Sequence, residues 1–246
     1  MDRMIYTAMT GAKHILEQQA TNSHNLANAT STGFKAQVDA FRAVPVISEG
    51  LPTRAFVVDA TAGADFRSGP IQTTGRDLDV AVLDKGWLVV QREDGSEGYT
   101  RNGALKISEN GILQTANGMA IMGDGGPISI PPDVKISIAK DGTISAVREG
   151  TSPGPSNIVG RLKLVNPDEN NLIRKTDGLF GTKDGSSAET DVNVHVASGA
   201  LEGSNVNVVE AMVNMISLAR QFETQMKLLQ SAENNANKAS QIFNLS

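Results

Sequence analysis

The sequence contains no cysteine, which excludes disulfide bonds and thiolate metal sites. Basic residues are not in excess, because 22 Lys and Arg stand against 27 Asp and Glu, so the positive face that nucleic-acid binding requires is missing. No run approaches the roughly 18 consecutive apolar residues of a membrane-spanning helix. The start of the chain also lacks the basic and apolar regions of a secretory signal. We therefore expect no nucleic-acid partner, no membrane insertion and no cleavable signal peptide.

Residues suited to catalysis or metal binding are few and dispersed. No two of the three histidines have the i, i+4 spacing that lets one helix face bind a metal: His14, His24 and His195. No Ser or Thr is grouped with a His and a carboxylate, as nucleophilic catalysis requires. Asp77 and Asp79 precede an apolar run with no further ligands nearby, and residues 123–126 lack the Lys-Ser/Thr of a phosphate-binding loop. The sequence therefore predicts no catalytic residue, no cofactor and no metal, and hence no enzyme.

Both ends of the chain have the periodicity of coiled-coil helices. Spacings of four and three alternate, as in a heptad seam, at Ile5, Met9, Ala12, Leu16, Gln19, Ser23 and Leu26. The same spacing recurs at Val208, Met212, Met215, Ala219, Phe222, Met226 and Leu229, and resumes at Ala236 and Phe243. Asn207 and Glu210 resemble a capping box that begins a second helix, which would extend ~54 Å to Phe243. The first helix is expected to stop near residues 30–33, with Gly33 as a left-handed cap.

The middle of the chain is rich in the Asx-Gly dipeptides that make β-hairpin turns. They are Asp94-Gly95, Asn102-Gly103, Asn110-Gly111, Asn117-Gly118, Asp141-Gly142, Asp177-Gly178 and Asp184-Gly185. Short β-prone runs such as Trp87-Leu88-Val89-Val90 lie between turns. The pattern predicts an antiparallel all-β domain over residues 76–199, with Trp87 in its core. Residues 35–75, punctuated by Gly, Pro and Thr, are expected to form an extended connector.

The expected fold class is therefore α+β. A discontinuous helical coiled-coil domain is formed by an N-terminal helix within residues 1–34 and a C-terminal helix within residues 200–246. The connector and the antiparallel β domain are inserted between these two helices.

The polar faces of the two expected helices carry amides where a solvated helix usually carries charge. From His14 to Phe34 the one formally charged residue is Glu17, whereas Asn and Gln are frequent, and the C-terminal helix repeats this composition. Asn and Gln both donate and accept hydrogen bonds, so identical chains can stack through them without repulsion between like charges. The pattern leaves two readings open: helices buried against neighbouring copies or lining a neutral channel, and a helical stalk that caps the β domain of a monomer.

Two terminal motifs resemble those of the bacterial flagellar rod and hook protein family. Residues His24-Asn25-Leu26-Ala27-Asn28 followed by Thr32-Gly33-Phe34-Lys35 are similar to the N-terminal signature, with His24 in place of the usual Asn. Ser204-Asn205-Val206, Met212-Val213-Asn214-Met215-Ile216 and Arg220-Gln221-Phe222-Glu223 resemble the matching C-terminal helix. In the middle, Leu78-Asp79-Val80-Ala81-Val82, Gly86-Trp87 and Tyr99-Thr100-Arg101-Asn102-Gly103 resemble the family's β domain. Phe41-Arg42-Ala43-Val44-Pro45-Val46 and Trp87-Leu88-Val89-Val90-Gln91 fit the proximal-rod branch best.

The resemblance implies a structural subunit of the flagellar drive shaft. Such a subunit is exported unfolded by the flagellar type III apparatus, and it assembles with copies of itself and with other proximal and distal rod proteins in the periplasm. Its paired terminal helices form a tube around the export channel. The residues expected at the assembly interface are Ile5, Met9, Leu16, Asn25, Leu26, Asn28, Gly33, Phe34, Asn205, Val208, Met212, Met215, Ile216, Arg220, Phe222, Met226 and Leu229.

Two alternatives stay open at this point. The first is a distal-rod or hook-type axial protein of the same family. The second is a monomeric β protein with a helical stalk that binds or acts on cell-wall glycan, for which Asp77, Asp79 and the loops near Gly125 and Gly185 are the supporting features.

Overall fold

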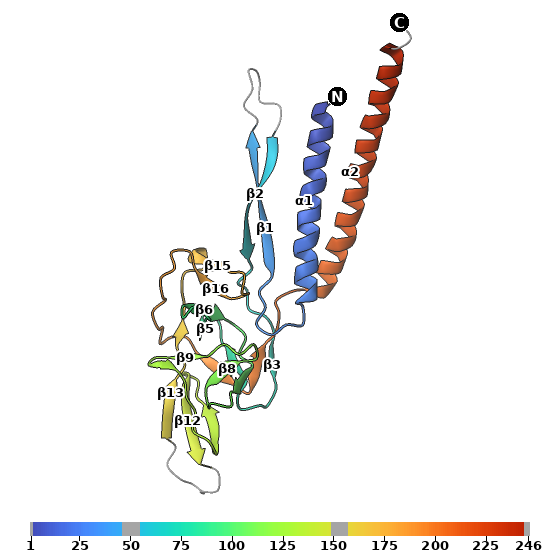
Figure 1. Ribbon diagram of the computed structural model, residues 1–246. Coiled ribbons are helices and arrows are strands. Elements are labelled where there is room, and N and C mark those ends of the chain that lie inside the picture. The colour runs from blue at the N-terminus through green and yellow to red at the C-terminus, as the bar shows by residue number, and fades with distance from the viewer. Residues whose placement is uncertain (1, 46–54, 149–156, 244–246) are drawn as a thin grey trace. The chain divides into compact units, whose positions relative to one another are not determined.

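The computed structural model describes residues 2–45, 55–148 and 157–243, and it divides the chain into two compact units (Figure 1). The first, here called the helical unit, comprises Met1–Ala29, Gln37–Gly63 and Val206–Ser246. The second, the β unit, comprises Thr30–Ala36 and Ala64–Asn205. Each unit is assembled from segments that are separated in the sequence, so neither is formed by one continuous stretch of the chain.

The helical unit contains two long antiparallel helices, α1 (Asp2–Ala27) and α2 (Val208–Phe243), which lie side by side in Figure 1. The predicted bounds of α2 are confirmed. Its N-cap is also confirmed, because Asn207 Oδ1 accepts hydrogen bonds from the amides of Val209 (3.1 Å) and Glu210 (3.3 Å). Strands β1 (Gln37–Pro45) and β2 (Ala55–Ala64) form a two-stranded sheet, and β1 contacts α1.

Helix α1 ends earlier than predicted. Its last residue is Ala27, and the amide of Asn28 bonds back to the carbonyls of His24 and Asn25. Gly33 is left-handed, with φ +67°, but it lies six residues beyond the helix and belongs to the β unit. A Cβ at this position would lie 2.3 Å from the carbonyl carbon of Arg101. Gly33 is therefore required by close backbone packing and not by a helix cap.

The β unit is built from short antiparallel strands, as the turn spacing predicted. They are β3 (Ile71–Thr73), β4 (Val80–Val82), β5 (Trp87–Gln91), β6 (Glu97–Thr100), β7 (Leu105–Ile107), β8 (Leu113–Thr115), β9 (Met122–Gly123), β10 (Gly126–Pro127), β11 (Val134–Ile138), β12 (Thr143–Arg148), β13 (Asn157–Arg161), β14 (Leu164–Val165), β15 (Leu172–Arg174), β16 (Phe180–Thr182), β17 (Val196–Ser198) and β18 (Ala200–Glu202), with a 3-10 turn at Glu169–Asn171. The largest sheet has the order β14-β5-β6-β16-β15, and a three-stranded sheet has the order β11-β12-β13.

Four of the seven Asx-Gly dipeptides join paired strands: Asp94-Gly95, Asn110-Gly111, Asp141-Gly142 and Asp177-Gly178. Each of these glycines has a positive φ, as a tight hairpin turn requires. Residues 123–126, which lack the residues of a phosphate-binding loop, form a turn between the paired strands β9 and β10. Among the other three Asx-Gly dipeptides, Asn102-Gly103 joins no paired strands, and Gly103 instead lies against the backbone of Val80.

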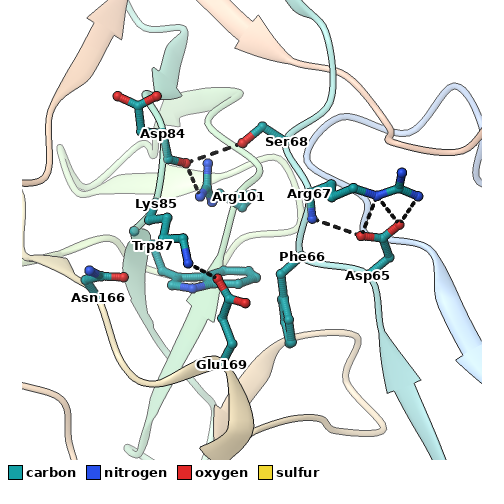
Figure 2. Close-up of a pocket in the computed structure, with 11 residues that line it drawn as sticks. Asp65, Phe66, Arg67, Ser68, Asp84, Lys85, Trp87, Arg101, Asn166 and Glu169 are labelled. Atoms are coloured by element: carbon teal, nitrogen blue, oxygen red, sulfur yellow. Dashed lines mark hydrogen bonds and ion pairs between the residues drawn. The ribbon is translucent and has the colours of Figure 1, made fainter.

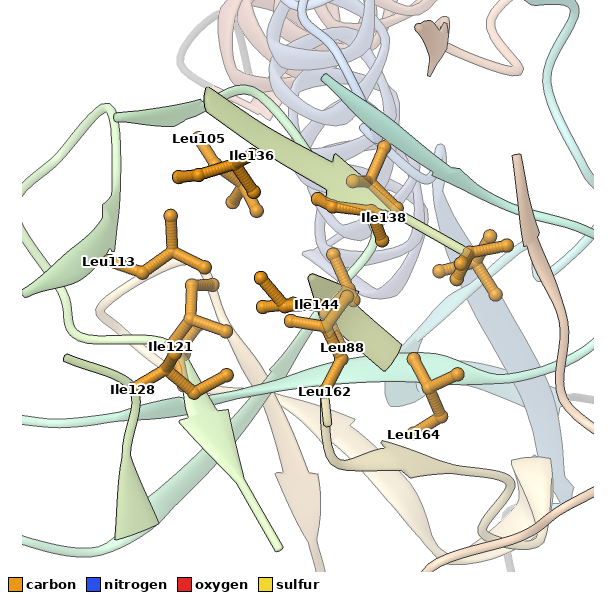
Figure 3. Close-up of a cluster of buried hydrophobic side chains, with 14 of the residues drawn as sticks. Leu88, Leu105, Leu113, Ile121, Ile128, Ile136, Ile138, Ile144, Leu162 and Leu164 are labelled. Carbon is orange, nitrogen blue, oxygen red and sulfur yellow. The ribbon is translucent and has the colours of Figure 1, made fainter. Parts of the chain in front are cut away.

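The core of the β unit is formed by two groups of buried side chains. In the larger group, aliphatic side chains such as Leu88, Ile121 and Ile144 converge from different strands (Figure 3). The smaller group contains Trp87 and Phe180, whose ring centroids are 4.7 Å apart. The predicted core position of Trp87 is confirmed. Each fully buried aliphatic side chain contributes roughly 1.5–3 kcal/mol.

A cluster of charged side chains is also buried in the β unit. The carboxylate of Glu202 accepts from Lys35 Nζ (2.7 Å) through one oxygen and from Arg101 Nη1 (2.9 Å) through the other. All three side chains are at least 97 % buried. Burial lowers the pKa of Lys35, while its hydrogen bond to Glu202 opposes that effect. Two cations thus share one buried anion.

The close approach at Gly103 leads to a stability prediction. In Gly103→Ala the new Cβ would lie 1.6 Å from the carbonyl oxygen of Val80, so the backbone must move. We expect a loss of roughly 2–3 kcal/mol, measured by urea unfolding with the fluorescence of Trp87, the single tryptophan, as the probe of the β unit. Gly125→Ala is the matched control, because no atom beyond its chain neighbours lies within 4 Å of the new Cβ. Its free energy of unfolding should stay within about 0.5 kcal/mol of the native value. Equal losses in both variants would contradict this account.

The cluster of Lys35, Arg101 and Glu202 leads to a second prediction, that removing its anion destabilises the fold more than removing one of its cations. Glu202→Gln leaves two buried cations without a carboxylate and should cost about 3–5 kcal/mol. Lys35→Met leaves the Arg101–Glu202 pair intact and removes a cation that burial disfavours, so its cost should be at least about 2 kcal/mol smaller. Urea unfolding followed by Trp87 fluorescence measures both. The account is wrong if Lys35→Met is as costly as Glu202→Gln.

Candidate assembly surfaces

Helices α1 and α2 pack through a seam of small and apolar side chains. On α2 the buried or half-buried residues follow the spacing of a heptad: Ala211, Met215, Leu218, Phe222, Gln225, Leu229 and Ala232. On α1, Ala12 and Ile15 are buried. Two contacts fix the register, since Gln225 lies 3.4 Å from the position of a Cβ on Gly11, and Asn22 Nδ2 donates to the carbonyl of Ala211 (2.7 Å).

The structure divides the predicted seams between two sides of each helix. Met215, Phe222 and Leu229 are half-buried on the seam, whereas Val208, Met212 and Met226 are exposed, as is Ala219. On α1, Ile5 and Leu26 are half-buried, whereas Met9 and Leu16 are about half exposed and Ser23 is exposed. The two heptad stripes share every seventh residue. Apolar periodicity alone therefore could not show which flank faces the partner helix.

The exposed flank of α2 forms an apolar surface, here called the outer stripe. Its residues are Val208, Val209, Met212, Val213 and Ile216. Val209 is 71 % exposed and Ile216 is 56 % exposed. Tyr6, Met9 and Leu16 form a similar exposed stripe on α1. Contiguous exposed apolar side chains of this kind mark interaction surfaces, because a solvated helix face is normally polar. Arg220, also in the predicted interface, is exposed one turn beyond Ile216.

Two grooves lie on the helical unit. One, of about 740 Å³, is lined by apolar side chains including Ile5, Phe222 and Met226. The other, of about 370 Å³, lies between α1, α2 and β1, and half of its lining residues are Asn or Gln; Asp39 is its one charged residue. Part of this amide face is used within the chain, because Asn25 accepts from and donates to the backbone of Gln37 (both 2.8 Å).

Three residues of the predicted interface lie in the β unit. The amide of Gly33 donates to the carbonyl of Glu202 (2.7 Å), and the guanidinium of Arg174 lies 4.7 Å from the ring centroid of Phe34. Asn205 also makes several intrachain hydrogen bonds. Asn28, in the helical unit, donates through its side chain to the carbonyl of His24 (2.9 Å). The contacts of these four residues therefore include intrachain ones.

Sequence reasoning missed several functional candidates. Val209, Val213 and Tyr6 fall outside the chosen heptad, although the consecutive Val208 and Val209 already signal an apolar face wider than one seam. The buried cluster of Lys35, Arg101 and Glu202 has no periodic signal, because its members come from three distant segments.

A recess of about 550 Å³ on the β unit is the remaining candidate for a ligand site (Figure 2). Lys85 pairs with Glu169 (2.9 Å) beside the indole of Trp87, and Arg67 pairs with its near neighbour Asp65 on the other side (2.5 Å). The hydrogen bonds from Arg67 hold the pKa of Asp65 below its usual value, which is the opposite of what a general acid needs. The recess thus gives no support to glycan hydrolysis.

The other chemical candidates from the sequence have structural partners. Asp79 is buried and accepts from Thr74 Oγ1 (2.7 Å), whereas Asp77 is exposed near Lys135. Among the described residues no group of three His, Cys, Asp or Glu side chains could hold a metal ion. In the same part of the chain, neither helix has the length and apolarity needed to span a membrane.

Comparisons with known proteins agree with the two-part architecture. Residues 197–242 match the family described as "Flagellar basal body rod FlgEFG protein C-terminal", and residues 81–146 match "Flagellar hook protein FlgE/F/G D1 domain". The first match covers nearly all of α2, and the second covers the first half of the β unit.

Full-length relatives define the family more closely. The chain is 48 % identical over 252 residues to the flagellar basal-body rod protein FlgF of Salmonella typhimurium, and 47 % identical over 256 residues to that of Escherichia coli; each alignment covers all of both chains. The flagellar basal-body rod protein FlgG of Agrobacterium fabrum is 30 % identical, over 95 % of this chain and 97 % of its own length. The similarity to the two FlgF proteins is much higher than that to FlgG. The chain therefore belongs to the FlgF family of flagellar basal-body rod proteins, a family of structural and non-enzymatic subunits.

Proposed function

We propose that the chain is a subunit of the proximal flagellar rod that polymerises through its two terminal helices. The observation that carries this proposal is the outer stripe of α2, five large apolar side chains on the side of the helix away from its intrachain seam. The opposite flank of α2 already packs against α1 within the chain, so covering the outer stripe requires another chain. Family membership supplies the occupant, a rod subunit.

The exposed stripes of the two helices favour an open, head-to-tail polymer. The outer stripe of α2 and the exposed stripe of α1 differ in sequence, so contact between them joins two different surfaces. Contacts between unlike surfaces give helical filaments when the rotation does not close. Removing apolar surface from water contributes roughly 25 cal/mol per Å², so five large side chains supply several kcal/mol for each neighbour.

The finer assignments form part of the same proposal. The partners are copies of this chain and other proximal and distal rod proteins, and the flagellar type III apparatus exports the chain to the periplasm. The amide groove formed by α1, α2 and β1 faces neighbours or the export channel, because uncharged amides avoid repulsion between stacked identical subunits. Torque then passes along packed helices.

A substitution in the outer stripe tests the proposal. Ile216 is 56 % exposed, so Ile216→Asp should leave urea unfolding of the purified chain within about 0.5 kcal/mol of the unsubstituted protein. In the rod the new carboxylate would be buried without a partner, at a cost of several kcal/mol. We expect loss of swimming, and loss of rods in isolated basal bodies, when this variant replaces the native subunit.

Ile216→Met is the matched control, since it keeps an apolar side chain of similar volume at the same position. It should restore swimming to at least half the native rate. Normal rods built from Ile216→Asp would show that the outer stripe is not an assembly surface. Failure of both variants would show that the position tolerates no change, for reasons other than charge.

A further inference from the structure

The chain passes between the helical unit and the β unit four times. The crossings fall between residues 29 and 30, 36 and 37, 63 and 64, and 205 and 206. Any force that acts on the helices can reach the β unit covalently through these four crossings. How firmly the chain is held inside the β unit next to each crossing therefore affects how directly such a force reaches the core of that unit.

Asn205 lies next to one of the four crossings and makes hydrogen bonds to residues that lie next to two others. Its Oδ1 accepts from the amide of Ala36 (2.7 Å), its Nδ2 donates to the carbonyl of Asp65 (2.8 Å), and its own amide donates to the carbonyl of Phe34 (3.3 Å). The amide of Asp65 also donates to the carbonyl of Ala36 (2.8 Å). One side chain thus links the segments before the second crossing, after the third and before the fourth.

The buried ion cluster of Lys35, Arg101 and Glu202 is hydrogen-bonded to the same segments. Lys35 donates to the carboxylate of Glu202 and to the carbonyl of Arg67 (2.9 Å), to which Asn205 Nδ2 also donates (3.1 Å). Gly33, which follows the first crossing, donates through its amide to the carbonyl of Glu202. All four crossings therefore lead into one hydrogen-bonded network.

We propose that this network, the crossing clasp, is the load-transmitting joint of the subunit. Asn205, Lys35 and Glu202 hold the four crossings as one cooperative unit, so twist applied to the terminal helices enters the β unit at a single fixed region. The geometry carries the inference, because buried, charge-assisted hydrogen bonds are strong and directional, whereas a flexible linker would yield under load. The role in torque rests on the proposed function, but the cooperativity of the clasp does not.

Hydrogen exchange of the purified full-length chain tests the cooperativity. Asn205→Ala removes the acceptor of the Ala36 amide directly. If the clasp is one unit, the amides of Gly33, Asp65 and residue 205 should also exchange at least about tenfold faster, although their own acceptors are unchanged. Amides of the core strand β5 should keep their rates. Faster exchange at Ala36 alone would overturn the proposal.

Lys163→Met is the matched control. Lys163 forms a comparable ion pair with Glu97 (2.6 Å) in the β unit, and neither residue is bonded to a crossing segment. Loss of this ion pair should leave the exchange rates of the four amides followed above, those of Gly33, Ala36, Asp65 and Asn205, within about twofold of the native rates. If Lys163→Met accelerates them as much as Asn205→Ala does, the crossings report general loosening of the β unit and the clasp is rejected.

Loading the rod tests the mechanical role. Cells that carry Lys35→Met, which removes the hydrogen bonds to Glu202 and to the carbonyl of Arg67, should assemble flagella in dilute medium. They should lose at least twice as many flagella as Lys163→Met cells after swimming in viscous medium. Should Lys35→Met assemble no flagella, the variant Lys35→Gln, which keeps a hydrogen-bond donor, is compared in the same way. Equal retention by the clasp variant and the control overturns the mechanical role. This outcome is separate from failure of the rod proposal, which the outer-stripe variants detect without load.

Discussion

Glu202 lies where the beginning and the end of this chain meet, and its carboxylate oxygens are shared between the buried cations Lys35 and Arg101. The Lys35–Glu202 contact joins residues 167 positions apart. Closing a loop of that length costs on the order of 5 kcal/mol in chain entropy, which a single hydrogen bond does not offset. The closure persists because the charge cluster, the side chain of Asn205 and the buried strands around them form together.

The helical unit also depends on contacts between segments that are far apart in the sequence. Helices α1 and α2 are joined by everything that lies between Ala27 and Val208, so their pairing is also a contact between distant segments. Their seam combines small side chains, such as Gly11, Ala12 and Ala211, with larger ones, such as Met215 and Phe222, that are only half-buried. Long helices with so thin a seam depend on further packing for their stability.

Local sequence signals predicted the elements well. Asn207 and the apolar period that follows it placed α2 correctly, and dipeptides such as Asp94-Gly95 placed hairpins, because capping and tight turns are decided by a few neighbouring residues. Gly33 and Gly103 were misread because a close approach to a distant backbone leaves no local trace. The flank of α2 that faces α1 was likewise beyond reach, since Val208 and Ala211 are equally compatible with a heptad. The Lys35–Glu202 pair could not be predicted from the sequence, because only the fold brings these distant residues together.

The large apolar side chains at the start of α2 are divided unequally between the flank that faces α1 and the exposed flank. Between residues 208 and 218 the intrachain flank presents Ala211, Met215 and Leu218, whereas the outer stripe presents five large apolar residues. A helix evolved to stabilise a monomer would place its larger apolar area on the buried side. The reverse arrangement in this stretch leaves most of its large apolar side chains outside the contact with α1. If a neighbouring rod subunit covers them, as proposed above, folding of the helical unit and assembly become two parts of one free-energy balance.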